Sequence, residues 1–119
     1  MYSRIIYPKL ESHLKNKLIT VITGMRRVGK TTAARHLLDS IKSENKLFID
    51  LERIENRHLF NQSSYKDIEL SLEAEGIDLS KKAHIVLDEV QLVPNISSVI
   101  KYLYDSHPIK FIVTSSSSF

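Results

Sequence analysis

The nine-residue segment Gly24 to Thr32, which reads Gly-Met-Arg-Arg-Val-Gly-Lys-Thr-Thr, constrains the fold of this chain more than any other stretch. Its two glycines let the backbone curl without Cβ clashes, so that successive N–H groups can point at one anion. The apolar, β-branched residues 18–23 precede the segment, and an amphipathic stripe of Ala34, Leu37, Leu38 and Ile41 follows it. A strand, a glycine-rich loop and a helix in this order are typical of a phosphate-binding P-loop.

The P-loop supplies the predicted nucleotide-binding residues. Lys30 is expected to bring its ammonium to the β- and γ-phosphates, and the Thr31 hydroxyl to bind Mg²⁺, which prefers hard oxygen ligands. For the side chains of Arg26 and Arg27 we favour exposure over phosphate or partner contact, because the loop backbone already supplies donors. The predicted ligands are ATP and Mg²⁺. The predicted nucleotide-binding residues are Gly24, Met25, Arg26, Arg27, Val28, Gly29, Lys30, Thr31 and Thr32.

A second group of candidate residues follows the apolar run Ala83–Asp88. This run reads as a buried strand that ends in the carboxylate pair Asp88-Glu89, which is the Walker B pattern. We expect Asp88 to hold the Mg²⁺ shell and Glu89 to polarise the water that attacks the γ-phosphate. The alternative is a strand followed by an acidic surface turn, and the upstream P-loop favours the nucleotide site.

Apolar periodicity and turn residues predict the remaining elements. Alternating strands and helices predict a single α/β domain of three layers, with a parallel sheet between helices. The expected helix after the P-loop ends near residues 43–45, and residues 52–64 read as a surface loop. We also expect strands at 46–50, 83–88 and 109–114 and a short helix at 8–15. A second helix is expected from residue 65 to Gly76, with Ser64 and Asp67 as a capping box at its start. A third is expected from residue 96 to Pro108, with Asn95 as its N-cap.

Polar residues Thr114 to Ser118 follow the last predicted strand. In P-loop ATPases with an extra strand between the Walker strands, a polar residue at this place senses the γ-phosphate or orients the water. Thr114 or Ser116 can take this role here, and a solvated tail is an equally good interpretation.

Composition excludes several other kinds of site. The chain of 119 residues has no cysteine, which rules out disulfides, thiolate metal sites and a cysteine nucleophile, and its five histidines show no metal-ligand spacing. A net charge of +3 gives no support for nucleic-acid binding. No apolar run approaches the roughly 20 residues that span a bilayer, and no secretory signal is visible, so we expect a cytoplasmic protein.

Three segments, 22–32, 85–95 and 112–117, resemble the AAA-type ATPases of archaea and bacteria that usually carry an uncharacterised C-terminal domain. The resemblance implies an ASCE-type sheet ordered 5-1-4-3-2, with phosphate and Mg²⁺ at Lys30, Thr31 and Asp88 and the catalytic water at Glu89. Ser115 stands where the family usually has glycine, so the sensor loop is expected to differ in shape. The family's fifth strand, lid, arginine finger and C-terminal domain are expected beyond Phe119, which makes residues 1–119 the N-terminal part of the ATP-binding domain.

The resulting hypothesis is Mg-dependent ATP hydrolysis by an AAA-type ATPase. The alternatives are a P-loop kinase, which needs an acceptor site, and a nucleotide-binding module without turnover. Self-association or a protein client are the partners that the sequence leaves open. The chain as given is expected to bind nucleotide far better than it hydrolyses it, because the arginines that it contains lack the context of a finger.

Overall fold

A computed structural model of the chain describes residues 19–23 and 27–116. Four strands form one all-parallel sheet in the order β1-β4-β3-β2, which confirms the predicted α/β class and the 1-4-3-2 part of the strand order. The strands are β1 (Ile19–Ile22), β2 (Lys46–Asp50), β3 (Ala83–Asp88) and β4 (Ile109–Thr114). The helices are α2 (Arg27–Ser40), α3 (Ile54–His58), α4 (Tyr65–Ala74), the 3-10 helix η1 (Val90–Leu92) and α5 (Ile96–Ser106).

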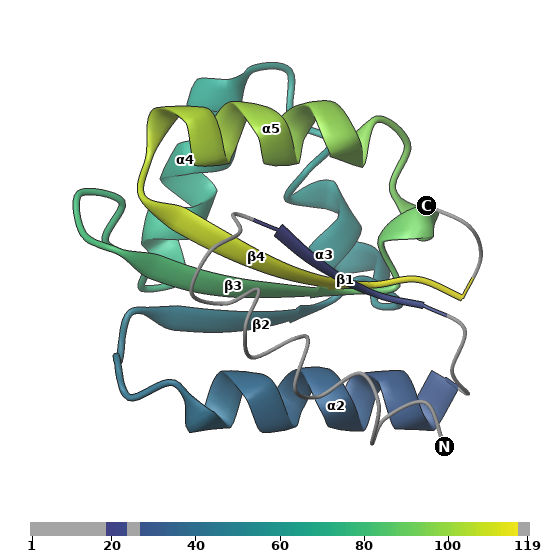
Figure 1. Ribbon diagram of the computed structural model, residues 1–119. Coiled ribbons are helices and arrows are strands. Elements are labelled where there is room, and N and C mark those ends of the chain that lie inside the picture. Colours follow the sequence, from purple (N-terminus) through teal and green to yellow (C-terminus); the bar gives the residue numbers. More distant parts are fainter. Residues whose placement is uncertain (1–18, 24–26, 117–119) are drawn as a thin grey trace.

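Helices cover both faces of the sheet (Figure 1). Helix α2 covers one face, and α3, α4 and α5 lie on the other. Side chains alternate along each strand, so Val86 packs with the residues of α2 while Ile85 and Leu87 pack in the larger core on the opposite face. Strands β3 and β4 are buried along their whole length, which is why both read as nearly continuous apolar runs.

Helix α4 begins and ends as the sequence predicts. The Ser64 hydroxyl accepts a hydrogen bond from the backbone N–H of Asp67 at 3.2 Å, which satisfies one of the free donors of the first turn. After the helix, Gly76 has a φ of +104°, a backbone conformation that residues other than glycine rarely adopt. The serine and the glycine therefore fix the two ends of this helix.

Helix α2 is shorter than predicted, because it ends at Ser40 rather than near residues 43–45. The Ser40 hydroxyl donates to the carbonyl of Leu37 at 2.7 Å. The Lys46 ammonium, which comes from β2, donates to the carbonyls of Leu38 at 3.0 Å and Ile41 at 2.9 Å. These donors satisfy the last carbonyls of the helix, and the chain can turn into β2 without a further helical turn.

The prediction of a continuous loop over residues 52–64 was wrong for α3. This helix buries no side chain, so it has no apolar stripe that a periodicity argument could detect. Side-chain donors fasten it to the preceding turn, because Asn56 Nδ2 donates to the carbonyl of Asp50 at 2.9 Å and Arg57 Nε donates to that of Leu51 at 2.6 Å.

Two further predictions have different outcomes. Asn95 does precede α5, but its φ is 62° and its side chain makes no capping hydrogen bond, so the predicted N-cap interaction was wrong. The helix predicted at residues 8–15 lies outside the described residues.

Candidate functional site

The carboxyl edge of the sheet brings together four of the residues that the two motifs predict. Lys30 and Thr31 come from the first turns of α2, while Asp88 ends β3 and Glu89 follows it. The sheet is continuous beneath them, because the backbone N–H of Ser115 donates to the carbonyl of Ile22 at 3.2 Å and joins β4 to β1. Parallel strands end together at such an edge, which is where α/β folds bind ligands.

Asp88 is held by two hydroxyl groups. The Thr31 hydroxyl lies 3.0 Å and 3.2 Å from the two carboxylate oxygens, and the Thr114 hydroxyl donates to Oδ1 at 2.6 Å. The same Thr114 oxygen accepts the backbone N–H of Glu89 at 2.8 Å. A buried carboxylate beside a threonine hydroxyl is a set of hard oxygen donors, and it fits Mg²⁺.

Lys30 and Glu89 form a buried pair of opposite charges. The exposed fraction is 1% for Lys30 and 2% for Glu89, and Lys30 Nζ lies 3.6 Å from Glu89 Oε2. Ser116 joins the two residues, since its hydroxyl accepts from Lys30 Nζ at 2.8 Å and donates to Glu89 Oε1 at 2.7 Å. The lysine therefore keeps charged and polar partners although water hardly reaches it.

The environment of Glu89 favours its ionised form. Burial pushes the pKa of this carboxyl upward, but hydrogen bonds from Gln91 and Ser116 and the charge of Lys30 outweigh burial and leave the pKa below its ordinary value. Oxygen Oε2 is buried and makes no hydrogen bond with the described part of the chain. Glu89 thus presents a carboxylate oxygen that can accept a proton.

Glu89 also has an unusual backbone. Its φ and ψ of 67° and 55° are left-handed, a conformation that costs a residue with a Cβ about 1–2 kcal/mol. The hydrogen bond from its N–H to Thr114 and the burial of Val90, the first residue of η1, hold this turn in place. The chain therefore reverses abruptly after β3, and the Glu89 carboxylate stays at the edge of the sheet.

The other predicted P-loop residues remain predictions. Gly24, Met25 and Arg26 lie outside the described residues, while Arg27 and Val28 form the first turn of α2. Beyond them, Gly29 is half-buried and Thr32 is exposed.

The end of β4 and the residue after it are buried rather than solvated, and the exposed Ser116 still reaches the site through its hydroxyl. Thr114 and Ser115 are both fully buried, and the hydroxyls of Thr114 and Ser116 contact the carboxylates of Asp88 and Glu89. Sensing of a γ-phosphate by either residue remains a prediction.

Gln91 is a site residue that the sequence reasoning did not select. Its side-chain amide donates to Glu89 Oε1 at 2.8 Å, and its amide oxygen accepts the backbone N–H of Ser116 at 3.4 Å. The only sequence signal is a glutamine two positions after the acidic pair, and the short helix η1 that turns it back toward Glu89 has no periodicity to reveal it.

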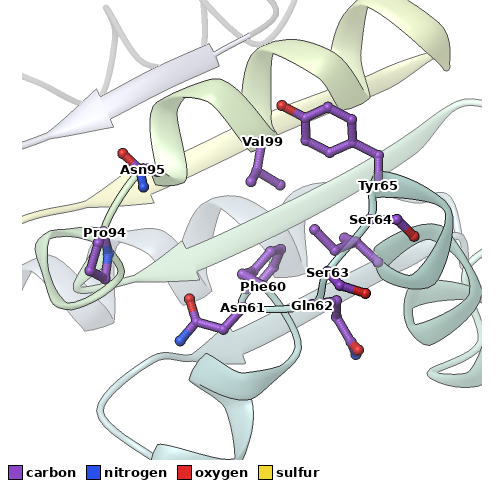
Figure 2. Close-up of a pocket in the computed structure, with 10 residues that line it drawn as sticks. Phe60, Asn61, Gln62, Ser63, Ser64, Tyr65, Pro94, Asn95 and Val99 are labelled. Carbon is purple, nitrogen blue, oxygen red and sulfur yellow. The ribbon is translucent and has the colours of Figure 1, made fainter.

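A separate cavity of about 530 Å³ opens between the loop before α4 and the start of α5, on the face opposite α2 (Figure 2). Its apolar wall includes Phe60, Ile68 and Val99, and amides and hydroxyls line the rest. None of its lining residues is charged, so it lacks the cations that a polyphosphate requires. The carboxyl edge of the sheet is therefore the better candidate for a nucleotide site.

Comparison with known proteins identifies the family of the chain. A family model described as an AAA domain matches residues 16–119, while a comparison with curated proteins gave no match. In residues 19–23 and 27–116, no helix is long and apolar enough to cross a membrane, and no cluster of three or more His, Asp or Glu side chains forms a metal site. Because the family match covers most of the chain and its two motifs meet at one edge of a parallel sheet, the chain belongs to the AAA domain family of P-loop ATPases in the AAA+ superfamily, a membership that implies nucleotide binding.

Proposed function

We propose that this chain binds Mg-ATP at the carboxyl edge of the sheet and that its residues hydrolyse the bound ATP. The observation that carries the proposal is one cluster in which a half-buried threonine lies with a buried lysine and two buried carboxylates. Thr31 and Asp88 are hydrogen-bonded to each other, and Lys30 is linked to Glu89 through Ser116. Such a cluster matches the separate needs of phosphate, metal and attacking water.

Each of these residues has one role in the proposal. The Lys30 ammonium exchanges its Ser116 contact for oxygens of the β- and γ-phosphates. Thr31 and Asp88 hold Mg²⁺, which when bound neutralises charge on the phosphates. Glu89 accepts the proton of the water that attacks the γ-phosphorus, and its lowered pKa keeps it ready to do so at neutral pH. The bond between the γ-phosphorus and the bridging oxygen breaks, and ADP leaves.

The two alternatives make different predictions for the same measurement. A kinase would transfer the phosphoryl group to an acceptor, whereas an ATPase releases phosphate from ATP and water alone. A binding module without turnover would bind ATP but release no phosphate. The ionised Glu89 next to the lysine favours hydrolysis, because a kinase does not need a base that activates water.

The decisive variant is Glu89→Gln, because an amide keeps the shape of the side chain but cannot take a proton. We expect its ATP affinity to stay within about twofold of the parent, while phosphate release nearly stops, since general-base catalysis is worth about 10²–10⁴-fold. Calorimetric titration and single-turnover phosphate release, with the chain in excess over ATP, measure the two effects. Lys30→Ala in the same titration should bind ATP tenfold or more weakly, a loss of about 1.5–3 kcal/mol.

Matched controls are available on the surface. Glu75→Gln and Lys42→Ala make the same chemical changes at exposed positions outside the site. Phosphate release by Glu89→Gln at the parent rate would show that another residue activates the water. Equal ATP affinities of Lys30→Ala and the parent would show that the lysine does not contact the nucleotide.

A further inference from the structure

We propose that Gln91 is a positioning residue for hydrolysis: it holds oxygen Oε1 of Glu89, so that Oε2 faces the attacking water and takes its proton. The inference rests on the proposed function, because it concerns the residue that we assign as the base. Gln91 belongs to neither the P-loop nor the Asp88-Glu89 pair, and its side chain makes the link to Glu89 from the helix η1.

The hydrogen bonds to the Glu89 carboxylate are unequally distributed. Oε1 accepts from Gln91 Nε2 at 2.8 Å and from Ser116 Oγ at 2.7 Å, and these two donors use both of its lone pairs. Oε2 is buried, makes no hydrogen bond within the described residues, and has only the Lys30 ammonium 3.6 Å away. Because Oε1 is saturated, a proton that arrives at this carboxylate finds its free lone pairs on Oε2.

The orientation of the Gln91 amide is fixed from both ends. Its nitrogen faces a carboxylate oxygen, which needs a donor, and its oxygen faces the backbone N–H of Ser116 at 3.4 Å, which needs an acceptor. The flipped amide would place an oxygen against a carboxylate and an NH₂ group against an N–H. Only one orientation satisfies both neighbours, so the amide holds Glu89 in one rotamer.

Gln91 differs from Ser116, the other donor to Oε1, in its independence from the P-loop. The Ser116 hydroxyl also accepts from Lys30 Nζ at 2.8 Å, so its arrangement changes when the ammonium moves to a phosphate. No hydrogen bond joins Gln91 to Lys30 in the described part of the chain, so Gln91 can retain Glu89 through that exchange.

Two substitutions separate the position of Glu89 from the stability of the fold. Gln91→Met keeps the length of the side chain and removes both ends of the amide. Gln91→Glu keeps an acceptor for Ser116 but places a second carboxylate against Glu89. Gln62→Met is the matched control, because Gln62 is an exposed glutamine whose amide, within residues 19–23 and 27–116, donates only to the Ser71 hydroxyl, at 3.0 Å.

Single-turnover phosphate release, measured as a function of pH and of the concentration of the chain in excess over ATP, provides the test. For Gln91→Met we expect half-saturation within about twofold of the parent and a maximal rate lower by roughly tenfold, the usual effect of one hydrogen bond to a charged group. The acid limb of the rate profile should move to higher pH, because Glu89 loses a donor that stabilises its ionised form. Gln91→Glu should move it further, and Gln62→Met should leave both unchanged.

The possible results separate a failure of the role of Gln91 from a failure of the proposed function. Thermal unfolding and ATP titration first establish that each variant is folded and binds nucleotide. If Glu89→Gln is inactive while Gln91→Met keeps the parent rate and pH profile, the inference is overturned and the proposed function stands. If Glu89→Gln turns over like the parent, the base has been assigned wrongly and the inference fails with it.

Discussion

The two ends of the strands carry opposite kinds of polar side chain on the face that α2 covers. At the amino end, Lys46, His84 and Lys110 are register neighbours on β2, β3 and β4, and they form a basic row. At the carboxyl end, Asp88 and Thr114 occupy the same face, because side chains alternate with a period of two. The strands hold both rows at the same spacing, so the differences between the rows come from their partners.

Those partners change the effect of burial. Burial, followed by the charges of Lys82, Lys110 and Lys46, lowers the pKa of His84 and favours its neutral form. At the carboxyl end burial acts against the ionised form of Glu89, but its hydrogen-bond donors and the Lys30 ammonium outweigh it. Converging donors thus favour the charged form of Glu89 at the carboxyl end, whereas burial and neighbouring like charges favour the neutral form of His84 at the amino end.

The largest effect is expected at the carboxyl end, from Thr114→Val. This change keeps the shape of the side chain but removes the hydroxyl between Asp88 Oδ1 and the buried N–H of Glu89. We expect the free energy of unfolding to fall by about 2–3 kcal/mol, since a buried donor is left without a partner. Urea denaturation measures this loss, and Thr20→Val, at a buried threonine of β1, is the control. An equal loss in both variants would show that the hydroxyl network does not stabilise this end of the sheet.

An intermediate effect is expected at the amino end, from Lys46→Met. The ammonium of Lys46 donates to two carbonyls at the C-terminal end of α2, and methionine keeps the apolar stem but removes both donors. The free energy of unfolding should fall by about 1–2 kcal/mol. The exposed Lys42→Met is the matched control. If both variants unfold at the same urea concentration, Lys46 has no role in ending α2.

The smallest effect is expected from His84→Gln, and it depends on pH. The pKa of His84 is lower in the folded chain than its ordinary 6.5, so the unfolded chain takes up this proton first as the pH falls. The folded chain therefore loses stability below that value, and this loss should shrink when the imidazole is removed. Urea denaturation at pH 7.5 and 5.5 measures the change, with the exposed His58→Gln as the control. An identical pH dependence of the free energy of unfolding in the parent and His84→Gln would show that His84 does not make the stability of the chain depend on pH.

The sequence predicts the strands well for a physical reason. Buried parallel strands require uninterrupted apolar side chains, and residues 83–88 and 109–114 supply them at the lengths that the structure shows. The P-loop pattern can be recognised in the sequence because phosphate binding needs glycines and a lysine at fixed spacing, and its residue roles stay predictions. The contact between Thr31 and Asp88 then follows from the strand order, because it places α2 and β3 at the same carboxyl edge of the sheet.

What the sequence does not predict depends on contacts between side chains and backbone. The end of α2 depends on Lys46, which lies in another element, and α3 depends on Asn56 and Arg57 donors that leave no periodic pattern. The role of Gln91 depends on a turn at Glu89 that no local propensity indicates. Single hydrogen bonds between elements decide these features, whereas sequence patterns report the repeated burial of many residues.

The left-handed backbone of Glu89 narrows the range of sequences that this position accepts. Glycine, asparagine and aspartate tolerate such a conformation best, whereas β-branched residues are excluded from it. Glycine and asparagine have no carboxylate, and aspartate is one methylene too short to meet the donors of both Gln91 and Ser116. The residues that adopt this backbone conformation most easily cannot act as the proposed base. Glutamate can act as the base, but its backbone is strained at this position. Drift at this position would therefore pass through inactive chains, so selection for turnover would hold glutamate there against the preference of its own backbone.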